Sequence, residues 1–292
     1  MRIDLHSHSR ASDGTQPPGE VVALAAEAGL DVLGLTDHDS AAGWAEATAA
    51  ADQAGIVVVP GIEISTKHEG AGVHLLAYLP DPSHPALVAE LELVLAGRAG
   101  RLAGMLTQLR DAGVDIDESE VMRQVGEAKA IGRPHIADVL VAKGYAADRG
   151  GAFTAWLDWG RPGYVTRYAS DTRAMVRIVT AAGGAAVVAH PWGRGSRRVL
   201  DLPTLASLQA DGLVGIEVDH QDHSGADREA LRAIGCELDL VTTGASDFHG
   251  EGKVDHELGC NLTHPAQYER LLDAATRNAK TAGAAVPAVD RP

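Results

Sequence analysis

Short runs of apolar residues alternate with longer, Ala-rich stretches along most of the chain. The apolar runs are rich in Val, Ile and Leu and have the length of buried strands, whereas the stretches between them have the spacing of amphipathic helices. This alternation is typical of βα units, in which helices cover a parallel sheet. It predicts strands at residues 3–6, 32–37, 56–62, 73–79, 186–189, 213–219 and 240–245.

The helices expected between these strands have recognisable ends. The first helix opens at Pro17-Pro18, runs to about Ala28 and ends at Gly29, as is usual for proline at a helix start and glycine just past a helix end. A second helix covers about residues 41–53, with Ser40 as its expected N-cap and Gly55 after its last turn. Further helices are predicted near residues 170–182, 203–210, 226–234 and 266–276.

The alternation breaks between about residues 84 and 160, where only helical patterns occur, at residues 86–111, 118–128 and 134–143. These stretches could be ordinary barrel helices around a missed strand, but we favour a small helical insertion. The predicted organisation is then a discontinuous barrel domain, an insertion and a disordered or loosely draped C-terminal tail. These parts cover residues 1–83 with 161–279, residues 84–160, and residues 280–292 respectively.

Composition narrows the class of protein. A chain of 292 residues that is 45% hydrophobic can form a single large α/β barrel. Its formal charge of −15 argues against a broad electrostatic grip on long nucleic acid, although local arginines and metal ions can still hold a small phosphorylated ligand. The chain has only two cysteines, Cys236 and Cys260, so no disulfide framework is indicated. We see no signal peptide and no apolar run of about 20 residues, and therefore expect a cytoplasmic protein without membrane contact.

Histidines and carboxylates recur where the predicted strands end. The C-terminal ends of parallel strands meet on one face of a barrel, which is where active sites are built. Six of the thirteen histidines and three carboxylates are therefore expected to share one site. The candidate metal ligands in or after the strands include His6, His8, His38, Glu63, His74, His190, Asp247 and His249.

The types of these residues indicate the metals. Imidazole and carboxylate groups without thiolates suit Mn²⁺, Zn²⁺ or Fe²⁺. Nine ligands are too many for one ion, whereas a bridging carboxylate would allow two or three ions a few ångströms apart. Such ions lower the pKa of a bound water and contact phosphoryl oxygens. We therefore expect a hydrolase with two or three divalent transition-metal ions, with Mn²⁺ favoured over Fe²⁺ and Zn²⁺.

Taken together, the sequence motifs resemble those of the PHP (polymerase and histidinol phosphatase) family. The resemblance runs from Met1 to about residue 260 and implies a distorted (β/α)₇ TIM-like barrel with three metal ions. It rests on the segments Asp4-Leu5-His6-Ser7-His8-Ser9, Ser12-Asp13-Gly14-Thr15, Thr36-Asp37-His38-Asp39, Gly61-Ile62-Glu63-Ile64-Ser65, His190-Pro191 and Ser246-Asp247-Phe248-His249-Gly250.

The resemblance also implies how the ligands divide. The first ion would be held by His6, His8, Glu63 and Asp247, the second by Glu63, His74 and His190, and the third by Asp13, His38 and His249. Some family members have a histidine where this chain has Asp13, a difference that keeps a ligand but could alter the preferred metal. Catalysis would proceed through a hydroxide on these metals, with His6, His8, Glu63, Asp247 and His249 as the catalytic ligands.

Other residues are candidates for substrate contact. The segment Gly132 to Ala137 resembles the part with which relatives cap the site, so Arg133 and His135 are expected to contact a substrate phosphate, with His135 also a candidate general acid. Without the resemblance, both would be read as ordinary surface and helix-start residues. Arg194, in the basic loop after His190, could hold a second phosphate or lie in solvent. Glu217 and His220 could support the ligands. The remaining histidines are interpreted as surface residues: His68, His84, His223, His256 and His264.

The predicted activity is hydrolysis of a phosphate monoester or terminal phosphodiester on a small nucleotide. The branch that the insertion resembles contains 3′,5′-nucleoside bisphosphate phosphatases and 5′→3′ exonucleases acting on short RNA. A histidinol-phosphate phosphatase and a catalytically idle PHP module are the alternatives. No long nucleic acid, membrane or obligate protein partner is implied.

Overall fold

The computed structural model describes residues 1–285 and residue 289, except for the side chain of Arg194. All seven predicted strands are present and form one curled sheet in the order β1-β2-β3-β4-β6-β7-β8. A short additional strand, β5, pairs with β3 inside the segment where only a helix is predicted. The strands are β1 (Ile3–Ser7), β2 (Val32–Leu35), β3 (Val57–His68), β4 (Ala71–Tyr78), β5 (Ser170–Asp171), β6 (Ala185–Ala189), β7 (Leu213–Asp219) and β8 (Val241–Gly244).

The sheet is not entirely parallel, and this part of the sequence prediction is wrong. β4 runs antiparallel to both of its neighbours, β3 and β6, while the other main pairs are parallel. The reason is a tight hairpin: β3 continues past its predicted end to His68, and the chain reverses at Glu69 and Gly70, both of which have positive φ. Glu63 therefore lies within β3 rather than at its end.

The two outer strands of the sheet approach each other and complete a distorted barrel. Ser7, at the end of β1, forms an isolated parallel bridge with Phe248, just after β8. The His8 amide donates to the Phe248 carbonyl at 2.8 Å. The predicted fold class, a distorted (β/α)₇ barrel with an all-helical insertion, is confirmed.

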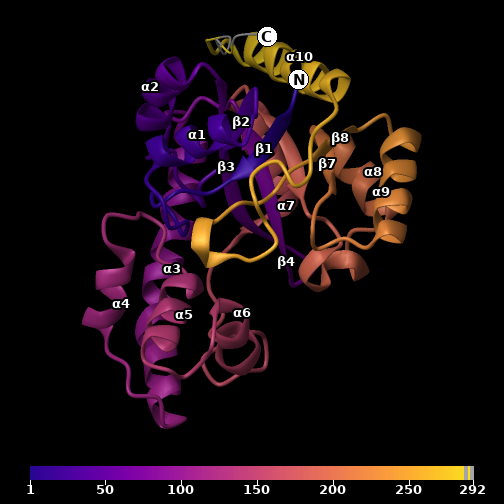
Figure 1. The fold of residues 1–292 in the computed structure, drawn as a ribbon. Coiled ribbons are helices and arrows are strands. Elements are labelled where there is room, and N and C mark those ends of the chain that lie inside the picture. The colour runs from indigo at the N-terminus through magenta and orange to yellow at the C-terminus, as the bar shows by residue number, and fades with distance from the viewer. Residues whose placement is uncertain (286–288, 290–292) are drawn as a thin grey trace.

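Helices surround this barrel (Figure 1). In the view of Figure 1, α1 and α2 lie on one side of the sheet, α8 and α9 lie on the other, and α10 lies near both termini. Gly43, not Ser40, is the residue before the second helix, whereas Gly55 ends it with φ +70° as predicted. The barrel helices are α1 (Pro18–Glu27), α2 (Trp44–Ala54), α7 (Thr172–Ala181), α8 (Leu202–Ala210), α9 (Gly225–Glu237) and α10 (Pro265–Ala282).

The predicted tail is shorter than expected. α10 extends to Ala282, and Gly283 caps it in the left-handed conformation with φ +67°. Helix propensity and packing against the barrel carry the chain past residue 280 because Tyr268, Leu271 and Ala275 are fully buried. Residues 286–288 and 290–292 of the predicted tail lie outside the described residues.

Residues 84–160, all of which are described, contain helices and no strand. They form α3 (Pro85–Asp111), α4 (Glu118–Val125), α5 (Arg133–Ala142), α6 (Arg149–Ala152) and a π-helical turn (Phe153–Leu157). These helices lie together at the lower left of Figure 1, on the opposite side of the molecule from α10. The second half of α3 packs with them in a hydrophobic cluster of their own, whereas Leu87 and Leu91 in its first half pack against the barrel. The packing therefore changes part-way along α3, later than the predicted boundary at residue 84.

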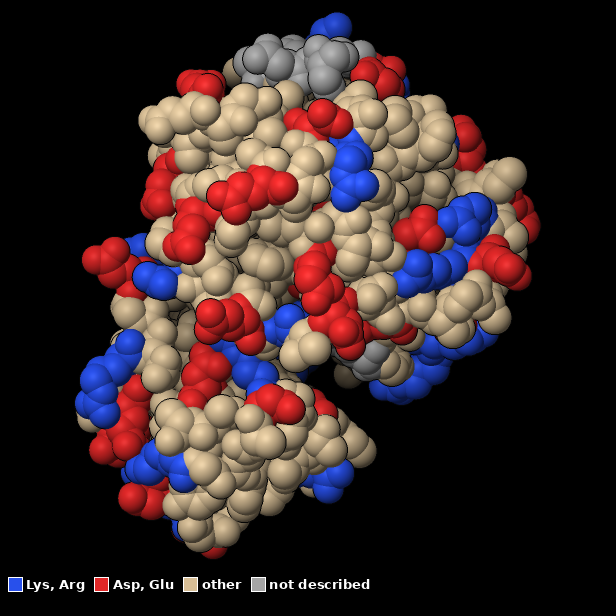
Figure 2. Space-filling view, in the orientation of Figure 1, with Lys and Arg blue, Asp and Glu red and all other residues tan. Residues whose placement is uncertain are grey.

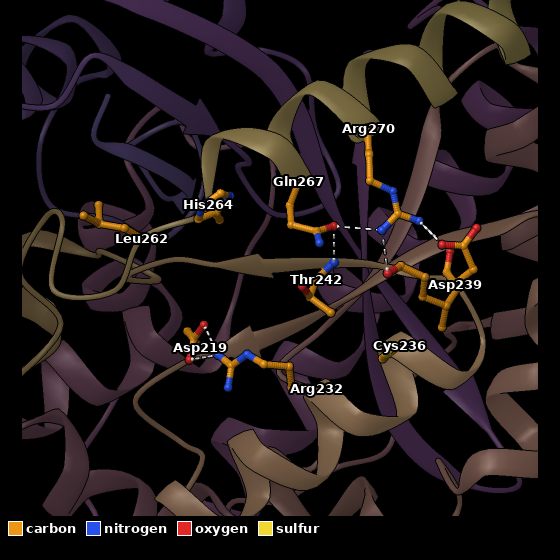
Figure 3. A pocket seen from close by; sticks show the side chains of 11 residues that line it. Asp219, Arg232, Cys236, Asp239, Thr242, Leu262, His264, Gln267 and Arg270 are labelled. Carbon is orange, nitrogen blue, oxygen red and sulfur yellow. Dashed lines mark hydrogen bonds and ion pairs between the residues drawn. The ribbon is translucent and has the colours of Figure 1, made fainter.

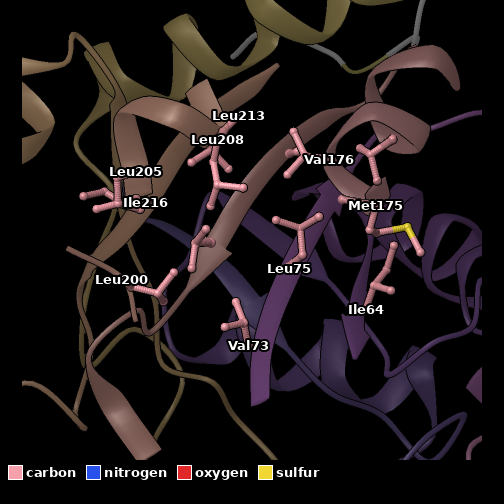
Figure 4. Packing of buried hydrophobic residues seen from close by; sticks show 14 of the residues in the cluster. Ile64, Val73, Leu75, Met175, Val176, Leu200, Leu205, Leu208, Leu213 and Ile216 are labelled. Atoms are coloured by element: carbon pink, nitrogen blue, oxygen red, sulfur yellow. The ribbon is translucent and has the colours of Figure 1, made fainter. Parts of the chain in front are cut away.

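Alternation along the hairpin strands decides which side chains can reach the interior. Ile62 and Ile64 flank Glu63 in β3, and Val73 and Leu75 flank His74 in β4. Since successive side chains of a strand point to opposite faces, the flanking residues face the helices and the polar residues face inward. Figure 4 shows Ile64, Val73 and Leu75 packed with residues of the helical layer such as Met175.

Candidate metal centre

The Glu63 carboxylate lies at the centre of a ring of imidazoles. Its Oε2 is 3.5 Å from His6 Nε2, 3.1 Å from His8 Nε2 and 3.1 Å from His38 Nδ1. Its Oε1 is 2.7 Å from His74 Nδ1 and 3.1 Å from His190 Nε2. Glu63 itself is only 1% exposed. The two oxygens thus face different halves of the histidine cluster, which is the arrangement expected of a bridging carboxylate.

Asp247 completes a four-residue group with His6, His8 and Glu63. Its Oδ1 is 3.4 Å from His6 Nε2 and 3.3 Å from His8 Nε2, and the two Nε2 atoms are 3.1 Å apart. The four ligand atoms lie within 4.8 Å of one another and all four residues are buried. Two imidazole nitrogens that face each other at this distance are better suited to binding a shared cation than to hydrogen bonding with each other.

Asp13 gathers a second set of histidines on the other side of His8. Asp13 Oδ1 is 3.5 Å from His8 Nδ1 and 3.4 Å from His249 Nε2, and Oδ2 is 3.7 Å from His38 Nε2. The His8 and His249 rings stack with centroids 4.1 Å apart. All nine residues predicted as metal ligands are therefore brought into one continuous cluster.

The outer nitrogens of the ring are held by neighbouring groups. His6 Nδ1 lies 3.1 Å from Glu217 Oε1, and Glu217 Oε2 accepts from the His190 amide at 2.8 Å. His220 Nε2 is 3.2 Å from Asp247 Oδ2. A carboxylate on one imidazole nitrogen fixes the tautomer and leaves the other nitrogen as a metal ligand. Glu217 and His220 thus take the supporting positions that the sequence suggested for them.

Two of the candidate ligands adopt backbone conformations that are uncommon for residues other than glycine. His190 has φ +28° and Asp247 has φ +53°, each just after a strand. Such a conformation costs about 1–2 kcal/mol per residue, and residues with this kind of backbone strain are typically found at functional sites. Asp4 supports Asp247 because it accepts hydrogen bonds from the amides of Ser246 (3.0 Å) and Gly259 (2.8 Å).

The carboxyl groups of the cluster carry negative charge. Burial alone would raise the pKa of Glu63, but His38 and His74 hold it well below the usual value. Burial also opposes ionisation of Asp247, whose pKa is nevertheless held far down by Lys253 and His6. For His8, burial is outweighed by hydrogen bonds to Asp247 and Glu63, which raise its pKa to about 9. Buried carboxylates that remain ionised beside imidazoles make a cavity that divalent cations neutralise.

Comparisons with known proteins also indicate a metal-dependent enzyme. The PHP domain family matches residues 4–110. A 3′,5′-nucleoside bisphosphate phosphatase from Chromobacterium violaceum is 37% identical over 257 residues, which are 88% of this chain and 90% of that protein. A 5′-3′ exoribonuclease from Haemophilus influenzae is 34% identical over 250 residues, 85% of this chain and 90% of that one. A crystal structure from Bifidobacterium adolescentis, assigned as a metal-dependent phosphoesterase, has a TM-score of 0.89 at 36% identity and covers 93% of this chain and 96% of its own.

The chain belongs to the PHP family. It is a metal-dependent hydrolase of phosphoester bonds, and the cluster around Glu63 supplies the donors that its divalent ions require. The donor set contains nitrogen and oxygen atoms but no sulfur, as a PHP phosphoesterase with hard or borderline metal ions would need.

The insertion of this PHP protein touches the loop that carries Asp13. His135 Nε2 is 3.0 Å from the Ser12 carbonyl, and its Nδ1 accepts from the Gly132 amide at 3.1 Å. Arg149 Nη1 donates to the Asp13 carbonyl at 3.1 Å. Because backbone groups occupy both ring nitrogens, His135 joins the insertion to the Asp13 loop and offers neither nitrogen to a substrate in this arrangement.

Of the two arginines predicted to bind phosphate, Arg133 has a described side chain and Arg194 does not. Arg133 lies with its guanidinium carbon 5.0 Å from the Phe153 ring centroid and donates to the Leu157 carbonyl at 3.1 Å, and its side chain is 31% exposed. The side chain of Arg194 lies outside the described part of the chain, so its predicted role stays a prediction.

Sequence reasoning missed several residues of the site. Lys253 pairs directly with Asp247. His256 and His223, predicted to be surface residues, are buried at 7% and 4% exposure. His256 Nδ1 lies 2.6 Å from the Ser246 carbonyl, and it forms a further potential ligand group with His220 and Asp247. The Lys253 segment follows the Ser246–Gly250 motif closely, and this proximity was the one signal available.

A pocket elsewhere on the barrel does not carry the chemistry. It lies between α9, β8 and α10, and its charged side chains are already paired, Arg232 with Asp219 and Arg270 with Asp239 (Figure 3). None of its lining residues belongs to the metal cluster.

The outer surface mixes both signs of charge, and a notch separates the helices of the insertion from the barrel (Figure 2). Across the described residues, the helices are too short or too polar for a membrane-crossing segment.

Proposed function

We propose that this PHP protein removes phosphate from a small nucleotide such as a 3′,5′-nucleoside bisphosphate and that it also shortens short RNA from the 5′ end. The observation that carries the proposal is the buried ring of imidazoles around Glu63, bordered by an insertion whose arginines lie next to it. The two relatives from Chromobacterium violaceum and Haemophilus influenzae support the choice of a nucleotide, since their similarity extends over the insertion as well as the barrel.

The proposed ligand sets are those that the family resemblance implies, and the first of them coincides with a group of four buried residues whose ligand atoms lie within 4.8 Å of one another. His6, His8, Glu63 and Asp247 would hold one ion, Glu63 with His74 and His190 a second, and Asp13 with His38 and His249 a third. Mn²⁺ is the ion we favour, with Fe²⁺ and Zn²⁺ as alternatives. When bound, such ions activate water and withdraw charge from phosphoryl oxygens.

The protein's own groups orient this centre. Glu217 holds His6, and His220 holds Asp247, so the ligand atoms stay aimed at the interior. His135 and Arg149 fix the Asp13 loop from the side of the insertion. We propose that residues 84–160 form a cap over the site. Within this cap, Arg133 and, from the barrel side, Arg194 would contact substrate phosphates, whereas His135 acts by positioning rather than as a general acid.

A phosphate-release assay on the Mn²⁺-loaded protein tests the proposal. The panel should hold adenosine 3′,5′-bisphosphate, adenosine 3′- and 5′-monophosphates, a cyclic phosphodiester, histidinol phosphate and a 5′-phosphorylated RNA trinucleotide. We expect the bisphosphate and the RNA to have the highest kcat/KM. A clear preference for histidinol phosphate or the cyclic phosphodiester would replace the proposed substrate, and no hydrolysis of any member would favour an idle PHP module.

A further inference from the structure

Four arginines meet where the insertion joins the barrel. Arg98 and Arg101 lie one turn apart on α3, Arg133 is the first residue of α5, and Arg167 lies in the segment that leads back to β5. We call these four residues the arginine cluster. Burial, followed by the charges of Arg167, Arg98 and Arg133, lowers the pKa of Arg101 to about 8. Burial and then Arg98 lower the pKa of Arg167 to about 10.

Too few carboxylates lie within reach to balance this charge. Arg98 pairs with Asp39 through Nε at 2.6 Å, and Arg133 Nη1 lies 3.9 Å from Asp158, whose side chain is 54% exposed. Among the described residues, neither Arg101 nor Arg167 has a carboxylate within ion-pair distance. Partly buried guanidinium groups without counter-charges are unfavourable unless an anion joins them.

The cluster lies directly beside the metal centre. Asp39 and Ser65, which bind Arg98, follow His38 and Glu63 closely in the chain, and burial and then the charge of Arg98 lower the pKa of His38. On its other side, Arg98 touches the start of α5, where a Cβ at Gly132 would lie 3.4 Å from Arg98 Nη1. An anion held by the arginine cluster would therefore be a neighbour of a group bound at the metals.

The backbone around these arginines is closely packed. A Cβ at Gly97 would come within 2.9 Å of Tyr168 Cβ, so α3 and the segment before β5 are in direct contact. Lys67 Nζ donates to the Arg167 carbonyl at 2.8 Å and fixes this segment to β3. The backbone segments that carry Arg101 and Arg167 are thus held close together before a ligand binds, which reduces the ordering that binding requires.

We propose that Arg101 and Arg167 bind the substrate phosphate that is not hydrolysed, and so select nucleotides that carry a second phosphate. This inference rests on the proposed function and adds a specificity site to it. Arginine suits the role because its planar group contacts phosphate with two parallel hydrogen bonds. The positive charge of Arg101 and Arg167, for which the described residues provide no carboxylate within ion-pair distance, is then balanced by the ligand.

The first test compares two substrates on the Mn²⁺-loaded enzyme. For Arg101→Gln and Arg167→Gln we expect the ratio of kcat/KM for adenosine 3′,5′-bisphosphate to that for the better monophosphate to fall about tenfold or more, mainly through KM. Arg101→Lys keeps the charge but loses the paired contact, and should give an intermediate ratio. The control is Arg110→Gln, an exposed arginine on the same helix, which should keep the wild-type ratio. An unchanged ratio in both glutamine variants would overturn the specificity site.

A second test does not depend on catalysis. Sodium sulfate should raise the Tm of wild-type protein more than sodium chloride of equal ionic strength does, and this difference should shrink in Arg101→Gln. Without sulfate, Arg101→Gln should melt above wild type, because one of four mutually repelling charges is gone. A sulfate effect equal in wild type, Arg101→Gln and Arg110→Gln would overturn the anion site. If no nucleotide is hydrolysed at all, the proposed function fails, while this measurement still decides whether the arginine cluster binds an anion.

Discussion

Replacing Glu63 by glutamine is the sharpest test of the metal centre. The substitution keeps the shape of the side chain but removes its charge and turns one oxygen into an amide donor. Glu63 Oε2 lies next to His6, His8 and His38, whereas Oε1 lies next to His74 and His190. Because the oxygens belong to two halves of the cluster, the loss should be felt by two ions.

The expected size of the effect follows from this count. A hydrogen bond or contact to a charged group contributes about 1.5–3 kcal/mol, so two such contacts amount to about 3–6 kcal/mol. At about 1.4 kcal/mol per factor of ten, kcat/KM should fall by roughly 10²–10⁴-fold. Metal content should fall by at least one ion per chain at the same time.

The assay combines phosphate release at saturating Mn²⁺ with elemental analysis and circular dichroism of the purified variant. Glu27→Gln, an exposed glutamate at the end of α1, is the matched control and should behave as wild type. If Glu63→Gln keeps its fold and loses less than about tenfold in activity, Glu63 does not bridge ions and the reasoning above is refuted.

Three further outcomes are expected. Elemental analysis of protein from metal-replete medium should find more than one transition-metal ion per chain, and active enzyme with one equivalent or less would contradict a multinuclear centre. Metal uptake near pH 7 should release protons, and metal binding should weaken as the pH falls. The reason is that the pKa of His8 is raised to about 9, so its imidazole is protonated in the metal-free protein and must lose the proton to bind a metal. Calorimetric heats of metal binding that do not vary with the ionisation enthalpy of the buffer would argue against this. Arg133→Ala should raise KM for the bisphosphate by about tenfold and change a monophosphate little if Arg133 holds a phosphate that is not cleaved. A fall of kcat on both substrates would instead place Arg133 at the reacting phosphate, and small equal changes on both would make it a surface residue.

The sequence identified the strands well because buried apolar runs of four to eight residues leave few alternatives. It did not give the direction of β4, since an apolar run reads alike in both directions. Glu69 and Gly70, between two alternating segments, were the available hairpin signal. Their tight reversal places His74 in the middle of its strand, opposite Ser65 and Ala189, rather than at a strand end.

The site residues that follow strands could be predicted from the sequence. The residues in loops could not, because their neighbours come from other parts of the chain and become adjacent only in the folded protein. His223 and His256 look like surface residues in the sequence, yet they are covered because their ring nitrogens lie against the carbonyls of Val218 and Ser246. The arginine cluster was missed for the same reason. Arg101 and Arg167 lie 66 positions apart in the chain, and each reads alone as an ordinary solvated charge.

The reversed strand β4 has a mechanical consequence. Because β4 runs opposite to its neighbours, the chain leaves it at the end of the barrel away from the candidate metal ligands. The next helix, α3, therefore has to run back toward the end that carries them. Its 27 residues span about 40 Å at ~1.5 Å per residue. The same unbroken helix packs first against the barrel and then within the insertion, so it joins the two parts as a rigid connection rather than as a hinge. We therefore expect the insertion to keep its position relative to the barrel, because one continuous helix joins the two parts.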